Sequence, residues 1–308
     1  MTTLSNEILE NYQVRKTKQQ KDAFISLLKS HHRDLQIQEG GLIKSRNIII
    51  GNVDQSKIIL SAHYDTCSRL PFPNFITPKN PIIYLLYTIA ILIPVFLLLL
   101  VFSILLQYLI ENFWINYISN LVLYFVICGL MLAGPPNKHN ANDNTSGIIT
   151  VFEMYNRLTP EEKQIVSIVL FDNEESGLLG SRLFKKIYKG QLNSKLLINF
   201  DCVSDGDYIL FAASKSAREN WSPEKYFIPN DGKIPLNEKL EQVLYPSDQQ
   251  GFPNAIAVAA LKKAKIIGYY MNRIHTSKDT VFDITNINYI THKTHDLISA
   301  AIIKTECR

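Results

Sequence analysis

The chain has 308 residues, enough for one large domain or two modest ones, and a formal net charge of +4 at pH 7. Only 19% of the residues are charged and they form no long basic block, so nucleic-acid binding is not expected. The first 20 residues contain no apolar run, so no cleavable signal peptide is expected. The cysteines lack CxxC spacing, which predicts unpaired thiols in a reducing compartment; they are Cys67, Cys128, Cys202 and Cys307.

The N-terminal part predicts a helix followed by two short strands. Residues 1–34 are rich in helix formers with an apolar face, which is typical of an amphipathic helix packed on a domain. The β-branched runs 47–50 and 58–62 predict strands joined by a turn. The second run leads into His63 and Asp65, whose side chains would share one face of an extended chain. Because a carboxylate can hold an imidazole in the tautomer that binds a metal, this pair is a candidate metal site.

Residues 82–134 predict a membrane hairpin. Their only charged residue is Glu111. The uncharged runs 82–106 and 114–133 are each about as long as the roughly 20 apolar residues that cross a bilayer core of about 30 Å. We therefore expect two transmembrane helices, inserted into a single split domain made of residues 1–81 and 135–308. The alternative is a long, uncharged pair of helices buried in a soluble core.

The charges that flank the hairpin predict its orientation. Arg69 and Lys79 precede it and Lys138 follows it, so the excess of positive charge predicts that the split domain lies in the cytoplasm. Only eight residues, 135–142, separate the hairpin from Asp143. An extended chain spans at most about 3.6 Å per residue, so Asp143 is expected within roughly 30 Å of the bilayer surface.

Acidic residues follow the hairpin at two places. Asp143 lies in the polar loop 140–146, ahead of a predicted helix, where an aspartate is often a helix cap but can also bridge two cations. The predicted strand 165–171 ends in a turn that carries Glu174 and Glu175. Adjacent carboxylates point in different directions, so one can bind a metal while the other transfers a proton. The alternative is an acidic helix start that favours the helix dipole.

The remaining pattern predicts an α/β fold with a mixed, largely parallel sheet sandwiched between helices. Asp201 follows another buried strand, so a third acid stands at a strand end, and His275 lies in a polar loop. Residues 214–250 are rich in proline and turn residues and predict a long surface excursion. The other expected elements are strands at 196–200, 208–213 and 264–268 and helices at 255–261 and 284–303.

Five motifs occur in one order along the chain: HYD, NDNTSG, FDNEESGLLGS, NFD and HTSKDT. This set resembles the zinc aminopeptidases of peptidase family M28, over about residues 45–81 and 135–303. The resemblance implies a co-catalytic pair of Zn²⁺ ions that activates a water to hydrolyse N-terminal residues from peptides. It implies that His63, Asp143, Glu175, Asp201 and His275 ligate zinc with Asp143 as the bridge, that Glu174 is the general acid and base, and that Asp65 orients His63.

Other residues carry smaller expectations. Asp279 is placed to support the loop of His275. Ser247 and Asp248 resemble a family stretch near the substrate pocket, although Gln249 stands where a histidine commonly follows. Cys67 is expected to be a small packing residue.

The leading interpretation is a zinc-dependent aminopeptidase anchored in a lipid bilayer and acting on peptides. One alternative is a related zinc glutaminyl cyclase, which shares much of the metal site. Another is a non-catalytic membrane receptor or scaffold on a peptidase-like domain. Such scaffolds typically lose ligands, whereas all five ligand positions and Glu174 are present here.

Overall fold

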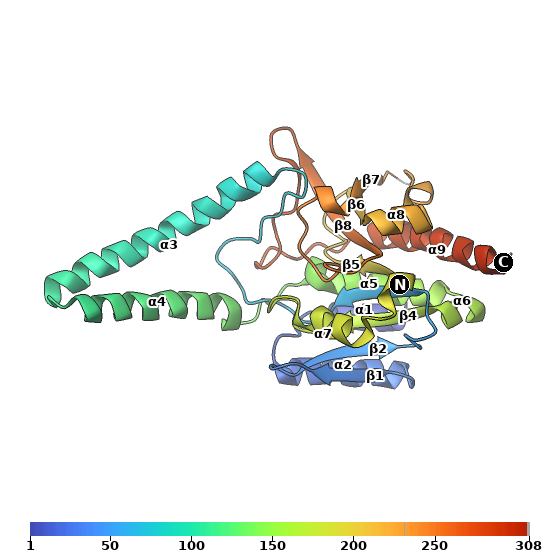
Figure 1. Cartoon of the computed structure of the whole chain (residues 1–308), viewed down its shortest axis with the longest axis horizontal. Helices are drawn as coiled ribbons and strands as arrows, with labels where there is room; N and C mark the ends of the chain where they lie inside the picture. The colour runs from blue at the N-terminus through green and yellow to red at the C-terminus, as the bar shows by residue number, and fades with distance from the viewer. Residues whose placement is uncertain (231, 307–308) are drawn as a thin grey trace.

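The computed structural model describes residues 1–230 and 232–306, which form a mixed nine-stranded sheet, helices that cover it, and a helical hairpin that projects to one side (Figure 1). Cys307 lies outside the described residues. The strands are β1 Gln36–Gly40, β2 Ser45–Ile50, β3 Ile58–His63, β4 Val166–Phe171, β5 Leu196–Phe200, β6 Tyr208–Ala213, β7 Ile234–Lys239, β8 Ala255–Ala264 and β9 Gly268–Tyr270. The helices are α1 Thr3–Asn11, α2 Lys18–His31, α3 Pro81–Leu109, α4 Phe113–Ala133, α5 Gly147–Arg157, α6 Pro160–Ile165, α7 Leu179–Tyr188, α8 Lys215–Trp221 and α9 Ile284–Glu306, with shorter turns η1 Ala141–Ser146, η2 Leu192–Ser194, η3 Pro223–Lys225 and η4 Leu240–Gln242.

The sheet order is β1-β2-β4-β3-β5-β8-β6-β7, and β9 pairs with β8. Strands β4, β3, β5 and β8 are parallel neighbours, whereas β2 pairs antiparallel with β4 and β6 pairs antiparallel with β8. The expected α/β class with a mixed sheet is therefore confirmed. Strands that precede the hairpin and strands that follow it belong to this one sheet.

Both faces of the central strands are buried, as their unbroken apolar sequences require. In β4, Ile168 and Leu170 join a large cluster with residues of α1, α2, α5 and α9. Val169 and Phe171 point to the opposite face and pack with Phe184 of α7. This alternation along one strand gives the sheet a helical layer on each side.

Three expectations about local structure were wrong. The run Ala255–Leu261 was expected to be a helix, but it lies in β8, and the expected strand 264–268 is the end of β8 and the turn into β9. Alanine favours helices, but this run is fully buried between β5 and β6, and the pairing of neighbouring strands overrides propensity. The polar segment 214–250 likewise contains α8 and β7.

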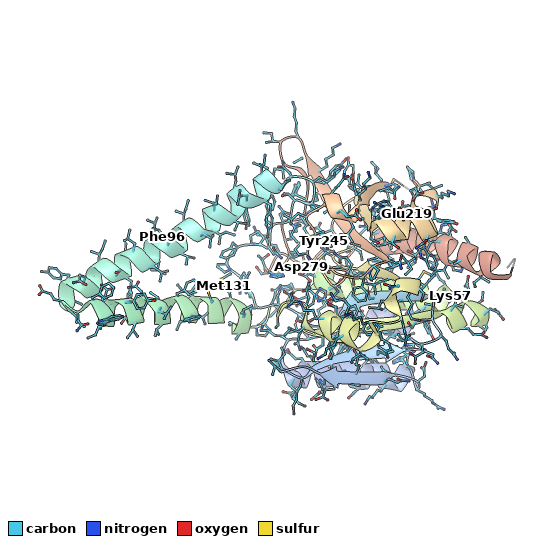
Figure 2. All side chains as sticks on the ribbon, in the orientation of Figure 1. Lys57, Phe96, Met131, Glu219, Tyr245 and Asp279 are labelled. Carbon is cyan, nitrogen blue, oxygen red and sulfur yellow. The ribbon has the colours of Figure 1, made fainter. Side chains whose placement is uncertain are left out.

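Helices α3 and α4 are each long and apolar enough to cross a membrane, and the most apolar 18-residue window of each has no buried residue. They are therefore not the buried helices of a soluble core. Figure 1 shows that they meet at the tip farthest from the sheet and diverge toward it. Near the tip, Asn116 Nδ2 donates to the carbonyl of Ser103 at 3.0 Å and to Gln107 Oε1 at 3.1 Å, which joins the helices through polar groups. Phe96, in the middle of α3, is 65% exposed (Figure 2).

Candidate metal centre

Three adjacent parallel strands deliver candidate ligands to one edge of the sheet. His63 ends β3 and pairs in register with Phe171, the last residue of β4, so the acidic turn after β4 begins beside His63. Asp201 directly follows β5, the neighbour of β3 on its other side. The carboxyl ends of parallel strands are where open α/β sheets bind their ligands. His63 and Asp201 therefore lie at the strand ends that their sequence pattern predicted.

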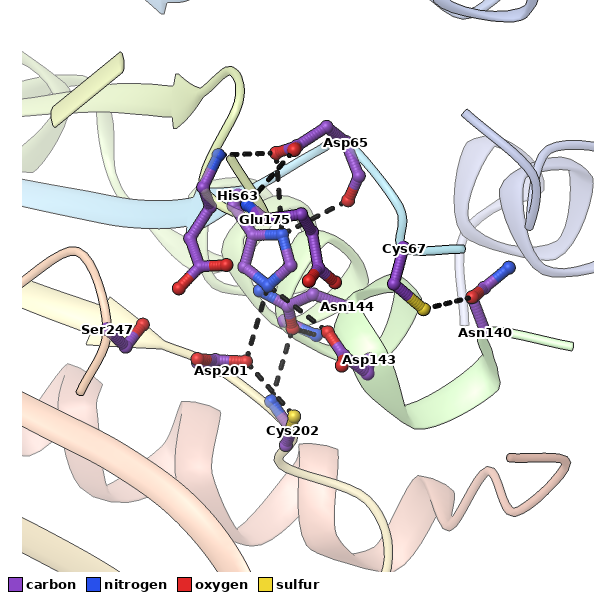
Figure 3. Close-up of polar contacts among 12 residues, drawn as sticks. His63, Asp65, Cys67, Asn140, Asp143, Asn144, Glu175, Asp201, Cys202 and Ser247 are labelled. Atoms are coloured by element: carbon purple, nitrogen blue, oxygen red, sulfur yellow. Dashed lines mark hydrogen bonds and ion pairs between the residues drawn. The ribbon is translucent and has the colours of Figure 1, made fainter. Parts of the chain in front are cut away.

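All five predicted ligands come together there, in two groups. Figure 3 shows four of them, His63, Asp143, Glu175 and Asp201. His63 Nε2 lies 3.2 Å from Asp143 Oδ1 and 3.4 Å from Asp201 Oδ1. His275 Nε2 lies 3.2 Å from Asp143 Oδ2 and 3.2 Å from Glu175 Oε2. Asp143 thus turns one oxygen to each group.

These donors fit zinc. Histidine nitrogen and carboxylate oxygen are its usual ligands, and two such donors on one tetrahedral zinc lie about 3.3–3.4 Å apart. The distances above agree with that separation. In addition, Glu175 Oε1 is buried and has no hydrogen-bond partner among the described residues. A buried carboxylate oxygen that accepts no hydrogen bond from the protein is available to bind a metal ion.

The charge balance of the site also favours a cation. Burial alone lowers the pKa of His63, yet the negative charge of Glu174 and the contacts with Asp143 and Asp201 raise that pKa well above its usual value. Burial also acts to lower the pKa of His275, but Glu175 and Asp143 raise that pKa well above its usual value. The excess of negative charge that raises the pKa of both imidazoles also attracts a metal ion.

The loop that carries Asp143 is held by a buried carboxylate from the far end of the chain. Asp279 accepts the backbone N–H of Asn142 at 3.0 Å and that of Asp143 at 3.0 Å, one on each oxygen. We expected Asp279 to support the loop of His275, but its carboxylate supports this loop instead. The flanking amide Asn144 donates from Nδ2 to the carbonyl of Phe200 at 3.0 Å, which ties the loop to the end of β5.

Asp65 has two separate contacts with the site. Its backbone carbonyl lies 3.1 Å from His63 Nδ1, closer than its own carboxylate oxygen at 3.7 Å. The carboxylate instead accepts the backbone N–H of Glu174 at 3.0 Å and of Glu175 at 3.2 Å. The carbonyl is thus the nearer acceptor for the imidazole, and the carboxylate fixes the acidic turn.

Glu174 belongs to neither donor group. Burial raises its pKa well above the usual value; His63 partly offsets this, and the charge of Glu175 adds to it. A carboxyl group with a raised pKa can both accept and donate a proton near neutral pH. Of the two glutamates, Glu174 therefore has the properties of a proton carrier and Glu175 the position of a ligand.

Sequence reasoning missed Arg15, which lies between α1 and α2. Its side chain is fully buried, donates from Nε to the carbonyl of Tyr64 at 2.6 Å, and donates from Nη1 to Thr145 Oγ1 at 3.1 Å. Burial lowers the pKa of Arg15 to about 9, while the charges of Asp65 and Asp143 act in the opposite direction. The N-terminal segment thus supplies a positive charge behind the candidate ligands. Nothing in a polar N-terminal stretch distinguishes this arginine from a surface one.

A cavity of about 170 Å³ opens beside the second donor group. Glu175, His275 and Cys67 line it, and so do Met131 and Leu132 from the last turn of α4. We expected Cys67 to be a packing residue. It is buried, and its sulfur lies within 4.8 Å of ligand atoms of Glu175 and His275, so it belongs to the surroundings of the site.

Ser247 and Asp248 lie apart from the cavity beside the second donor group. Both are fully buried, and neither is among the residues that line this cavity. Ser247 Oγ accepts a hydrogen bond from Asn199 Nδ2 at 3.0 Å. Burial raises the pKa of Asp248 to about 7, opposed by His63. Gln249 is bonded within the protein, because its Nε2 donates to the carbonyl of Tyr245 at 2.7 Å.

The chain was compared with known proteins. Residues 130–302 match the family model of peptidase family M28, whereas a comparison with curated protein sequences found no match. The LapA aminopeptidase of Legionella pneumophila is 13% identical with a TM-score of 0.56, over 96% of this chain and 67% of that one. A glutaminyl cyclase of Porphyromonas gingivalis is 14% identical with a TM-score of 0.57, over 97% of this chain and 96% of that one. At these identities the structures show a common fold, and because the family model covers more than half of the sequence, the chain belongs to peptidase family M28.

Proposed function

We propose that this protein is a zinc-dependent aminopeptidase. The observation that carries the proposal is the position of Asp143, whose two oxygens lie 3.2 Å from His63 Nε2 and 3.2 Å from His275 Nε2. One carboxylate that faces two sets of donors is the arrangement of a bridging ligand in a two-metal site. We therefore assign two Zn²⁺ ions to these sets, with Asp201 completing the first and Glu175 the second.

The chain's own residues divide the chemistry between them. When bound, the zinc pair would polarise the scissile carbonyl of a peptide and lower the pKa of a water molecule. Glu174 takes the proton of that water and gives it to the departing amine, because it is free of both donor sets and its pKa is raised. Asp65 keeps Glu174 in position through the backbone N–H that its carboxylate accepts.

The test combines metal content with turnover. The purified full-length chain in detergent is expected to contain about two zinc ions by elemental analysis and to release the N-terminal residue from a panel of aminoacyl substrates. A protein with two zinc ions that hydrolyses none of the panel would contradict the proposal. If the protein binds no zinc, a non-catalytic receptor or scaffold becomes the favoured function. The intact set of candidate ligands argues against that outcome.

A glutaminyl cyclase is the second candidate. It is supported by the Porphyromonas gingivalis cyclase, a protein of similar length that matches this chain over 96% of its own length. The two activities give different products, so one assay separates them. A peptide with N-terminal glutamine loses ammonia and keeps its length under a cyclase, whereas an aminopeptidase releases free glutamine.

We also propose that α3 and α4 anchor the protein in a membrane. Both helices are long and apolar enough, and their apolar side chains are exposed along their length. With two spans, residues 1–81 and 135–308 lie on the same side, as the parts of one catalytic domain must. Arg69, Lys79 and Lys138 flank the hairpin, which assigns that domain to the cytoplasm.

A further inference from the structure

The cavity beside the second donor group is built partly from the hairpin. Glu175 and His275 form one part of its wall, and Met131 and Leu132 of α4 form another. Figure 2 shows Met131 at the end of α4 that meets the sheet domain. A helix that only anchored the domain would not need to contribute to the wall of this cavity.

The last turn of α4 is fixed in that position by hydrogen bonds. Lys16 Nζ donates to the carbonyl of Leu132 at 2.6 Å, and Ser68 Oγ donates to the same carbonyl at 2.8 Å. The backbone N–H of Arg69 donates to the carbonyl of Pro135 at 2.9 Å. Because Lys16 and Ser68 themselves line the cavity, the end of the helix and the cavity form one unit.

The same turn lies where a bilayer would end. Helix α4 has 21 residues and is about 32 Å long, which matches a hydrocarbon core of about 30 Å. Its first turn carries the contacting aromatic residues Phe113 and Trp114, whereas Phe75 and Tyr87 pack together at the domain end of α3, with ring centroids 4.9 Å apart. The first pair lies at the tip of the hairpin and the second at its domain end, and aromatic residues at both ends are typical of a hairpin whose ends lie in the two membrane interfaces. Met131, two residues before the end of α4, is then at the lipid boundary.

The size of the cavity limits what it can hold. At about 170 Å³ it is smaller than the 300–1,000 Å³ of usual small-molecule pockets. The cavity therefore holds about one residue of a peptide, and the remaining residues of that peptide must extend out past the rim of the cavity. On the side of α4, that rim is made of the side chains of Met131 and Leu132, which are 38% and 64% exposed.

We infer that the substrates of this site are peptides held at the membrane surface, with the N-terminal residue in the cavity and the following residues against the last turn of α4. This inference rests on the proposed aminopeptidase activity and names its substrate class. An apolar chain beyond the first residue stays in the lipid interface and contacts Met131, whereas a soluble peptide has to be drawn from water to the same rim.

The experiment uses the full-length chain in phosphatidylcholine vesicles and two peptides with the same N-terminal residue. One peptide carries a palmitoyl group three residues after the cleaved bond, and the other is the soluble form. Met131→Gln is compared with Leu130→Gln, a change of similar polarity at a neighbouring position that is 62% exposed and does not line the cavity. Both variants are checked for vesicle retention and zinc content.

The ratio of kcat/KM for the lipidated peptide to that for the soluble peptide is the readout. Met131→Gln is expected to lower this ratio about tenfold, which corresponds to the loss of one apolar contact, and Leu130→Gln is expected to leave it within about twofold of wild type. Recruitment to the vesicle is the same for both variants, so recruitment alone cannot produce the difference. Equal ratios in the two variants would overturn the inference.

A second measurement uses the wild-type protein and does not depend on folding of a variant. A short spacer between the cleaved bond and the palmitoyl group keeps the free N-terminus of the peptide within reach of the interface. Cleavage of the three-residue form is therefore expected to be at least as fast as that of a form with a spacer of about 20 residues. Cleavage of the long-spacer form alone would overturn the inference and leave the aminopeptidase activity standing. If neither the lipidated nor the soluble peptide is cleaved, the proposed function fails and the inference fails with it.

Discussion

Replacement of Asp279 by asparagine tests whether the loop of Asp143 governs metal binding. The carboxylate of Asp279 accepts two backbone N–H groups, from Asn142 and Asp143, each at 3.0 Å. An asparagine side chain has the same shape, but one of its two terminal groups is a donor. It can accept one N–H and must turn its own NH₂ toward the other.

The burial of Asp279 determines the free-energy cost of this substitution. Asp279 is 1% exposed, so water cannot replace the lost acceptor. A buried N–H left without a partner costs about 1–3 kcal/mol, and hydrogen bonds to charged groups lie at the upper end, so about 2–3 kcal/mol is expected. If the loop must be ordered to bind metal, this is a loss of about 30- to 140-fold in affinity. Removal of groups that orient metal ligands typically costs 10- to 100-fold.

The assay is competition for zinc with a chelator of known affinity, on protein that is monodisperse in gel filtration. Because Asp143 faces both donor sets, Asp279→Asn is expected to weaken the binding of both zinc ions. Asp283→Asn is the matched control, since Asp283 lies four residues further on and forms a partly exposed ion pair with Lys233 at 2.8 Å. The control is expected to stay within about threefold of wild type. Wild-type affinity for both ions in Asp279→Asn would refute the reasoning.

Three further predictions follow from the site and the hairpin. Glu174→Gln should keep both zinc ions and lower kcat by about 10²- to 10⁴-fold, because it removes the proton carrier and no ligand; near-wild-type kcat would exclude this role. Asp143→Ala should lower zinc content by elemental analysis more than His63→Ala, because only Asp143 faces both sets; two zinc ions in Asp143→Ala would exclude a bridge. Reporter fusions after residue 112 and at the C-terminus should lie on opposite sides of the membrane, with the C-terminus in the cytoplasm, and a translocated C-terminus would contradict the proposed topology.

The sequence alone predicted the part of the site that depends on strand ends. His63 and Asp201 each follow an apolar run that is buried on both faces, and such runs can be recognised without knowledge of their neighbours. The positions of Asp143 and His275 could not be obtained in this way, because both lie in loops whose paths depend on contacts far along the chain. The local pattern left Asp143 open between a helix cap and a bridge, and the order of the motifs assigned both residues to the metal site.

Other features depend on tertiary contacts that a single sequence does not encode locally. The alanine-rich strand β8 has helical propensity, and only its place between β5 and β6 makes it a strand. Arg15 is a core residue because the chain between α1 and α2 passes behind the site. The separate contacts of the carbonyl and the carboxylate of Asp65 likewise follow from the fold of the turn after β4.

The point at which the hairpin enters the chain explains how the fold accepts it. Residues 64–80 leave β3 at the carboxyl edge of the sheet, and the chain that returns from α4 comes back to the same edge. Ser68 pairs antiparallel with Pro136, and the N–H of Asn137 donates to the carbonyl of Cys67 at 3.2 Å. Because these segments lie side by side before and after the hairpin, two helices can be inserted there without a change in the sheet. The same pairing brings the end of α4 to the cavity of Glu175 and His275, so one insertion provides both the proposed anchor and a wall of the candidate active site.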